Sequence, residues 1–229
     1  MPIQPNRCPC RPEAIIFDFD GVLVESLDVK TNTFRELLKD YPQNIEAFIK
    51  YHIENGGVSR FEKIKFFFKE LRAESISKKD VLRWADRYSR LVVEQVVKSK
   101  LVEGAQELLK FCRGRYLLFV VSGTPEEELK LIIQRKKLGH FFKGIFGSPA
   151  KKTVIVQKIL SKYKINPQKS IFIGDARTDL AAARVHGMAF IARLNDDNKE
   201  FFQNKTFLGS FKNLRGVRSL LQNLEKVNV

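Results

Sequence analysis

The chain has 229 residues, of which 44% are hydrophobic and 19 are phenylalanine, enough for a packed core domain and a smaller insert. No apolar stretch approaches the roughly 20 residues of a membrane span, and residues 1–12 lack the apolar segment of a signal peptide, so we expect a cytoplasmic protein without membrane contact. The net charge of +15 is spread along the chain in proportion to length. Such a diffuse positive field attracts small anionic substrates and indicates no specific nucleic-acid partner.

The most informative segment is Ile15–Leu23, in which a short apolar strand runs into Asp18-Phe19-Asp20-Gly21. Side chains alternate along a strand, so the backbone must curl after Asp18 if both carboxylates are to reach one site. Gly21 permits that turn and lets a ligand approach the main chain closely. Two carboxylates at the carboxyl end of a buried strand suit Mg²⁺ binding and nucleophilic chemistry by an aspartate.

From Leu27 to about Val102 the apolar pattern is helical throughout. The apolar stripes are Phe61, Ile64, Phe68 and Leu71, then Val81, Ala85, Tyr88, Val92 and Val96. Two glycines interrupt the pattern in the segment 51–60, after which Ser59 is expected to cap the next helix. The basic run Lys63–Lys69 has Glu62 and Glu70 beside it, which is typical of a solvated helix face.

From Glu103 onward, helical segments alternate with buried strands, which predicts a parallel sheet covered by helices, with ligands at the carboxyl ends of the strands. The strands are expected at 116–121, 144–146, 170–174 and 189–194, followed by a short edge element and a last helix around 214–224. A first helical face precedes them, formed by Val102, Ala105, Leu108, Leu109 and Cys112.

Three of these strands end in polar motifs. Ser122-Gly123-Thr124 places small hydroxyls before a helix start, where free N–H groups can bind a phosphate. Gly147–Lys152 opens another helix with a lysine that could point at a phosphate. The third motif, Gly174–Asp179, ends a buried strand in two carboxylates four residues apart. Each motif alone also fits an ordinary helix cap or a solvated side chain, but their common position at strand-to-helix junctions favours one shared site.

The three cysteines add little to this interpretation. Their odd number argues against a complete disulfide framework. Cys8 and Cys10 lie in a proline-rich leader, and no second Cys/His pair completes a metal site with them. We interpret this pair as incidental.

In this order the four motifs resemble those of the haloacid dehalogenase superfamily, in its phosphatase branch with a helical cap inserted after the first motif. The resemblance covers nearly the whole chain. Asp18-Phe19-Asp20-Gly21 matches the first motif, Ser122-Gly123-Thr124 the second, Lys152 the third through Ser-Pro-x-x-Lys, and Asp175 with Asp179 the fourth. It implies an α/β fold, with a Rossmann-like doubly wound parallel sheet in residues 1–26 and 103–229 and an all-helical cap domain in residues 27–102.

The resemblance also implies roles for the motif residues. Asp18 corresponds to the nucleophile and Asp20 to the general acid and base. Asp18, the Asp20 carbonyl and Asp175 would hold Mg²⁺, with Asp179 supporting them. The transferring phosphoryl group would be bound by Ser122 and Lys152, with Gly21 and Gly123 beside it.

The cap loop is where the resemblance places substrate recognition. A Gly-x-Ser-Arg loop faces the active site in similar proteins, so Gly57, Ser59 and Arg60 are expected to contact the leaving group, with His52 or Asn55 as further candidates. Arg60 suits a second anionic group, because a guanidinium binds a carboxylate or phosphate with two parallel hydrogen bonds.

The implied reaction is Mg²⁺-dependent hydrolysis of a small phosphorylated metabolite, such as a sugar phosphate or a phosphoglycolate-like acid, through an aspartyl phosphate. One alternative is a phosphomutase similar to β-phosphoglucomutase, although such mutases usually have a histidine where Lys30 stands. A dehalogenase would lack Asp20, and a phosphonatase would need a Schiff-base lysine in its cap, for which Lys30 is the candidate. A non-catalytic binding or scaffold protein would have lost a catalytic carboxylate, and none is missing. The oligomeric state is left open.

Overall fold

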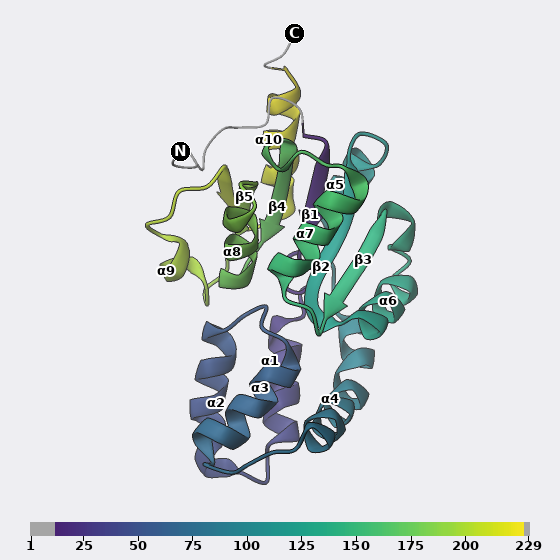
Figure 1. Ribbon diagram of the computed structural model, residues 1–229. Helices are drawn as coiled ribbons and strands as arrows, with labels where there is room; N and C mark the ends of the chain where they lie inside the picture. Colours follow the sequence, from purple (N-terminus) through teal and green to yellow (C-terminus); the bar gives the residue numbers. More distant parts are fainter. Residues whose placement is uncertain (1–11, 227–229) are drawn as a thin grey trace.

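The computed structural model describes residues 12–226 (Figure 1). Within this range a single sheet of six parallel strands has the order β3-β2-β1-β4-β5-β6. The strands are β1 (Ala14–Phe17), β2 (Leu117–Pro125), β3 (Gly144–Ser148), β4 (Ser170–Gly174), β5 (Ala189–Arg193) and β6 (Gly209–Phe211). This order places β1 between β2 and β4, so the segment that follows β1 lies at the middle of the sheet edge.

The sheet has a hydrophobic core on each face, because successive strand residues point to opposite sides. Ile15 and Phe17 pack with α5 (Ala105–Cys112), α6 (Glu126–Arg135) and α10 (Leu214–Lys226) on one face. Ala14 and Ile16 pack with α7 (Lys152–Tyr163) and α8 (Arg177–Val185) on the other. The short helix α9 (Lys199–Phe202) and the 3₁₀ turns η2 (Gly139–Phe141) and η3 (Pro167–Lys169) complete this part. Helices on both faces confirm the predicted doubly wound α/β fold.

The predicted helical insert lies beyond the carboxyl ends of the strands (Figure 1). It consists of α1 (Leu27–Leu37), α2 (Pro42–Glu54), α3 (Arg60–Phe66), the π-helical turn η1 (Phe67–Leu71) and α4 (Lys78–Lys98). The chain enters and leaves it through two adjacent segments, since Val24 and Leu101 form an antiparallel bridge and the Val102 N–H donates to the Leu23 carbonyl at 3.0 Å. The domain boundaries at 26/27 and 102/103 stay a prediction.

Two details of the structure differ from the sequence interpretation. Strand β2 continues to Pro125, past the expected end at Val121, because Pro125 still pairs with Ser148 of β3 after a shift in register. The prediction of a solvated basic face was wrong for Lys63, which is only 4% exposed, because α3 turns this position toward α2 and the interior.

Two further expectations concern membrane-spanning segments and the cysteines. Within residues 12–226, no helix has both the length and the apolar character needed to cross a membrane. Cys8 and Cys10 lie outside the described residues, and Cys112 is buried as a free thiol in α5.

Candidate active site

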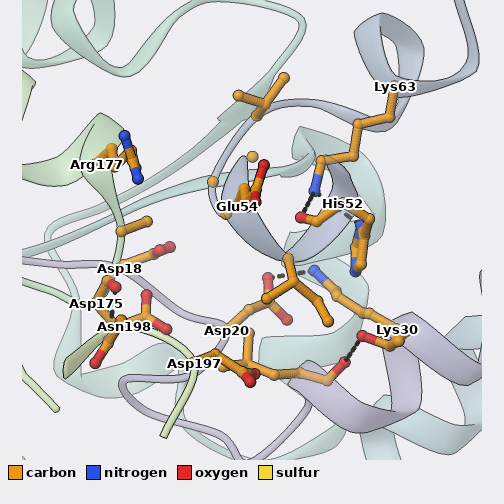
Figure 2. Close-up of a pocket in the computed structure, with 18 of the residues that line it drawn as sticks. Asp18, Asp20, Lys30, His52, Glu54, Lys63, Asp175, Arg177, Asp197 and Asn198 are labelled. Atoms are coloured by element: carbon orange, nitrogen blue, oxygen red, sulfur yellow. Dashed lines mark hydrogen bonds and ion pairs between the residues drawn. The ribbon is translucent and has the colours of Figure 1, made fainter. Parts of the chain in front are cut away.

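A cavity of about 360 Å³ lies where the carboxyl ends of β1, β2 and β4 meet the helical insert (Figure 2). Asp18, Asp20 and Asp175 line it from the sheet side, together with the Ser122-Gly123-Thr124 segment. Lys30 of α1, His52 of α2, Arg60 and Lys63 of α3, and Tyr88 of α4 line it from the helical side. The parallel order of the strands therefore brings the first, second and fourth motifs to one cavity.

Lys152 joins the third motif to the first and fourth. It is the first residue of α7, and its buried ammonium lies 2.7 Å from Asp18 Oδ2 and 2.6 Å from Asp179 Oδ1. Burial alone would lower the pKa of Lys152, but the charges of Asp179 and Asp18 outweigh burial and raise this pKa above its ordinary value. Lys151, the other lysine of this motif, is exposed. The structure therefore places a permanent positive charge beside Asp18.

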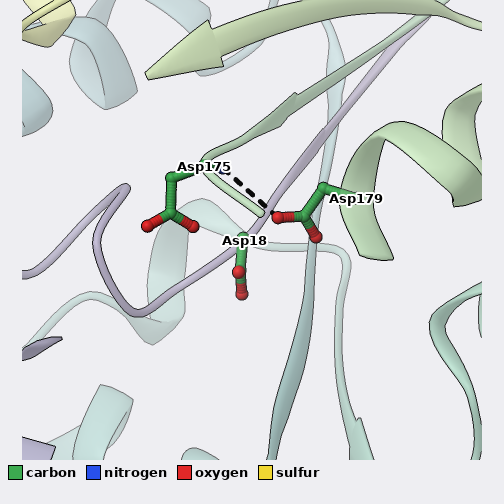
Figure 3. A group of neighbouring side chains, drawn as sticks. All are labelled: Asp18, Asp175 and Asp179. Carbon is green, nitrogen blue, oxygen red and sulfur yellow. Dashed lines mark hydrogen bonds between the residues drawn. The ribbon is translucent and has the colours of Figure 1, made fainter. Parts of the chain in front are cut away.

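Three buried carboxylates come together from the ends of β1 and β4 and the first turn of α8 (Figure 3). Asp18, Asp175 and Asp179 each offer an oxygen, and these oxygens lie within 4.8 Å of one another. Asp179 Oδ2 also accepts hydrogen bonds from the backbone N–H groups of Ala176 (3.0 Å) and Asp175 (3.3 Å), which fixes its orientation.

The electrostatics of this cluster fit a divalent cation. Burial and the charge of Asp179 raise the pKa of Asp18 to about 7, against the lowering effect of Lys152. Burial and the charge of Asp18 raise the pKa of Asp175 well above its ordinary value, and Asp175 makes no ion pair within the described range. The three carboxyl groups of the cluster therefore have one cationic partner in the described part of the chain, Lys152. Carboxylate oxygens at this spacing are the ligands that Mg²⁺ prefers.

Asp20 has a different environment, because its carboxylate is fully engaged by donors. Ser26 donates to Oδ1 at 2.7 Å, while Ser122 (3.1 Å) and Thr124 (2.9 Å) donate to Oδ2. Lys30 forms an ion pair with the same oxygen and donates to the Thr124 hydroxyl at 2.8 Å. Burial alone would raise the pKa of Asp20. The charge of Lys30 and the hydrogen bonds from Lys30, Ser26 and Thr124 outweigh burial and lower this pKa below its usual value. The pKa values of Asp18 and Asp20 are therefore shifted in opposite directions, although only one residue separates them.

At two motif positions, neighbouring atoms lie so close to the backbone that only glycine fits. At Gly21, where φ is +75°, a Cβ atom would stand 2.2 Å from an Asp175 carboxylate oxygen. At Gly123 it would stand 2.5 Å from the Gly57 carbonyl oxygen, so the second motif packs directly on the cap loop. The loop also contacts the fourth motif, since the Thr178 hydroxyl donates to the Gly56 carbonyl at 3.4 Å.

The cap-loop candidates have three different placements. Gly57 and Arg60 line the cavity. Ser59 caps α3, where its hydroxyl accepts from the Glu62 N–H at 3.5 Å, and Asn55 donates to the Tyr51 carbonyl at 2.9 Å; neither is among the residues that line this cavity. His52 lines the cavity and packs against the Phe34 ring.

The Arg60 guanidinium is already paired. It is 5% exposed and forms a two-pronged ion pair with Glu128 of α6, with one N–O distance of 2.7 Å. It also donates to the Ser89 hydroxyl at 2.6 Å and lies 4.5 Å from the centre of the Tyr88 ring. This pair connects the helical insert to the sheet domain and compensates the charge that the sequence interpretation assigned to substrate.

Sequence reasoning missed several contacts at this site. Thr124 and Lys30 hold Asp20, and Lys63 contacts His52. Asn198, from the segment before α9, donates to the Asp175 carbonyl at 2.8 Å and to the Arg193 carbonyl at 2.9 Å. Lys30 stands where mutases usually have a histidine, and Lys63 lies three positions after Arg60 on the same helix face. The position of Asn198 has no local signal in the sequence.

Comparisons with known proteins agree with this architecture. Residues 15–193 match the family model of haloacid dehalogenase-like hydrolases. Phosphoglycolate phosphatase of Pseudomonas putida is 25% identical over 191 residues, which span 77% of this chain and 67% of that protein. Phosphoglycolate phosphatase of Mannheimia succiniciproducens is 25% identical over 180 residues, which span 75% of this chain and 80% of that protein.

Solved structures show the same fold. β-Phosphoglucomutase of Clostridium difficile aligns with a TM-score of 0.76 at 18% identity, covering 94% of this chain and 98% of that one. At this identity the likeness concerns the fold alone.

The chain belongs to the haloacid dehalogenase-like hydrolase family, because the family model matches well over half of it. The resemblance that the four motifs predicted is confirmed, and so is the prediction of a hydrolase of the phosphatase type.

Proposed function

We propose that this protein is a Mg²⁺-dependent phosphatase that hydrolyses a small phosphorylated metabolite through an aspartyl phosphate. The observation that carries the proposal is a cavity lined by Asp18, Asp20 and Asp175, with the Lys152 ammonium in contact with both Asp18 and Asp179. The names of the curated relatives support a phosphoglycolate-like acid as the substrate class. The cytoplasmic location stays a prediction.

In the first step, an oxygen of Asp18 attacks the phosphorus atom in line with the leaving oxygen, and the P–O ester bond breaks. A phosphate monoester is negatively charged and repels a carboxylate, so the approach needs compensation. Lys152 supplies part of it, since its ammonium contacts Asp18 and can reach the equatorial oxygens of a phosphoryl group bound there. The Ser122 hydroxyl, which donates to Asp20 here, would turn to the phosphoryl group, and backbone N–H groups of the second motif would add neutral donors.

Asp20 serves the proton transfers. The leaving oxygen needs a proton in the first step, and the water that hydrolyses the aspartyl phosphate must lose one in the second. In the structure, Asp20 is held as a carboxylate by Lys30, Ser26 and Thr124, the form required for the second step. Loosening of the Lys30 contact would raise the pKa of Asp20, because that contact stabilises the charged form, and Asp20 could then carry the proton that the leaving oxygen needs in the first step.

Asp18, the Asp20 carbonyl and Asp175 would hold Mg²⁺, with Asp179 orienting them. When bound, this ion would neutralise charge on the phosphoryl oxygens and on the cluster. The excess of carboxylates over Lys152 and the raised pKa values of Asp18 and Asp175 support this assignment. Gly57 and Arg60 would shape the cap side of the site.

The test is phosphate release from a panel of phosphorylated metabolites with and without Mg²⁺. Wild type is compared with Asp18→Asn, Asp20→Asn and, as a matched control, Asp28→Asn, which changes an acidic residue in the first turn of α1. Mg²⁺-dependent release that requires Asp18 and Asp20 but not Asp28 is expected. Release that persists in Asp18→Asn would refute the aspartyl-phosphate route.

The panel includes β-glucose 1-phosphate to examine the mutase alternative. Formation of the 6-phosphate isomer without free phosphate would replace the phosphatase by a mutase. We expect phosphate release instead, because Lys30 occupies the position beside Asp20. Tight Mg²⁺ binding without turnover of any ester would favour a non-catalytic binding protein.

A further inference from the structure

Lys63 is a buried cation without a carboxylate partner. Its side chain comes from α3, lines the cavity and is 4% exposed. The ammonium lies 2.9 Å from His52 Nδ1 and donates to the His52 carbonyl at 3.0 Å. These contacts use two of its three N–H donors, and among residues 12–226 no acidic side chain forms an ion pair with it. One donor is therefore left for a ligand, and the positive charge of Lys63 has no acidic partner among these residues.

The other cations that line the cavity are engaged, and so is Lys152, which contacts Asp18. Arg60 is compensated by Glu128, Lys30 by Asp20, and Lys152 by Asp18 and Asp179. Arg177 is exposed and lies 4.4 Å from the centre of the Phe201 ring. Lys63 is thus the buried positive charge of this cavity that lacks an acidic partner within the described residues. It lies with His52 and Lys30 on one side of the view, whereas Asp18 and Asp175 lie on the other (Figure 2).

The surroundings of Lys63 are costly for a cation. Burial and the charge of Lys30 lower the pKa of Lys63 to about 7, although Asp20 opposes them. Burial, then Lys63 and Lys30, lower the pKa of His52 well below its usual value, so His52 is neutral. A neutral imidazole can accept from Lys63 at Nδ1 but adds no positive charge. A buried cation held in this way is stabilised when an anion arrives beside it.

We propose that Lys63, positioned by His52, binds a carboxylate on the leaving group, so that the preferred substrates are small phosphomonoesters that carry a carboxylate. This inference rests on the proposed phosphatase function. A carboxylate is favoured over a second phosphate because it carries one negative charge, which matches the one uncompensated positive charge. The cavity of about 360 Å³ suits a small ester bound with its phosphoryl group at Asp18 and its other end toward the cap.

The test compares 2-phosphoglycolate with ethyl phosphate, which has the same two-carbon length and no carboxylate. The measured quantity is the ratio of their kcat/KM values in wild type, Lys63→Met and Lys63→Arg. Lys65→Met is the matched control, since Lys65 lies on the same helix, is 43% exposed at its side chain and pairs with Glu62. Lys63→Met is expected to lower the ratio by about 10- to 150-fold, the effect of one hydrogen bond to a charged group.

Lys63→Arg should keep most of the preference because it keeps the charge, and Lys65→Met should leave the ratio within about threefold of wild type. A wild type without preference for 2-phosphoglycolate, or a preference that Lys63→Met leaves unchanged, would overturn the proposal. A ratio lowered equally by Lys65→Met would also overturn it. Propane-1,3-diol bisphosphate is added as a third ester, and a Lys63-dependent preference for it over 2-phosphoglycolate would refute the carboxylate assignment.

Calorimetric binding separates this inference from the proposed function. The affinities of 2-phosphoglycolate and ethyl phosphate are measured in the presence of Mg²⁺ for Asp18→Asn and for Asp18→Asn/Lys63→Met. If wild type hydrolyses none of the esters, the phosphatase proposal fails, whereas the ratio of the two affinities still tests Lys63. The carboxylate site is supported if Asp18→Asn binds 2-phosphoglycolate more tightly than ethyl phosphate and the double variant does not. It is refuted if Asp18→Asn binds the two esters equally well.

Discussion

The affinity of the acidic cluster for Mg²⁺ should depend strongly on pH. Burial and Asp179 raise the pKa of Asp18 to about 7, and burial with the Asp18 charge raises the pKa of Asp175 well above its ordinary value. A cation binds the charged form of a carboxylate, so it competes with these protons. Below pH 7, binding of Mg²⁺ should therefore displace protons from the cluster.

The size of the effect follows from Asp18 alone. A group with a pKa near 7 is charged in about 90% of molecules at pH 8 and about 10% at pH 6, so the apparent dissociation constant should rise about tenfold over this range. Protons on Asp175 would make the dependence steeper. The raised pKa also means that the Asp18 contribution to the stability of the metal-free protein is present below about pH 4 and is lost as the pH rises through 7. Mg²⁺ should therefore raise the melting temperature more at pH 8 than at pH 6.

Isothermal titration calorimetry at pH 6 and pH 8, in two buffers of different ionisation enthalpy, gives both the dissociation constant and the number of protons released. Asp18→Asn is the control, since it should release about one proton fewer at pH 6. Equal dissociation constants at the two pH values, with no proton released at pH 6, would refute this account of the cluster.

Three further outcomes test particular contacts. Gly123→Ala should lower kcat/KM by about 100-fold in steady-state assays while the melting temperature changes little, because its Cβ would stand 2.5 Å from the Gly57 carbonyl oxygen and displace the cap loop. Arg60→Met should cost about 3–5 kcal/mol in urea unfolding, because among the described residues it leaves the buried Glu128 carboxylate without a cationic partner and with only the Ser89 hydroxyl as a donor, and Arg60→Met/Glu128→Gln should recover most of this loss. Lys63→Met should raise the free energy of unfolding at pH 7 by about 2 kcal/mol. The lowered pKa of Lys63 means that burying its charge destabilises the wild-type fold by about 4 kcal/mol at this pH, and the variant removes that penalty. The two hydrogen bonds that the variant loses offset about half of the gain. The destabilisation by the Lys63 charge is fully present below pH 7 and vanishes above about pH 10, so the stabilisation by Lys63→Met should shrink as the pH rises. A stabilisation that does not depend on pH would contradict this reasoning.

The motif residues could be predicted because each follows a strand of a parallel sheet. Asp18, Ser122 and Asp175 come directly after β1, within β2 and after β4, and these three strands are neighbours. Strand order was not needed in detail, since the carboxyl ends of parallel strands share one edge of the sheet. Apolar runs and junction residues were therefore enough to indicate the fold and the acidic cluster.

The cap side of the site could not be predicted in the same way, because its charges are paired across long sequence separations. Glu128 fits the acidic first turn of a helix, and nothing local shows that it binds Arg60, 68 residues earlier. Lys63 shares a basic run with exposed residues, and only the packing of α3 against α2 separates it from them. Asn198 contacts Asp175 from a loop whose path no hydrophobic period sets. Because the partner of a charged side chain is set by the tertiary structure, the sequence alone indicates a substrate anion, and not Glu128, as the partner of Arg60.

The distribution of charge explains why ligands should stabilise this protein. Three carboxylates on the sheet side share one lysine, and Lys63 on the cap side has no acidic partner among residues 12–226. These groups are buried, so keeping any of them charged raises the free energy of the ligand-free fold. A divalent cation compensates the first excess and an anionic leaving group compensates the second. Because a ligand that binds only the folded state stabilises it, Mg²⁺ and a carboxylated phosphate ester should raise the melting temperature of Asp18→Asn more together than either alone, and Lys63→Met should remove the part due to the carboxylate.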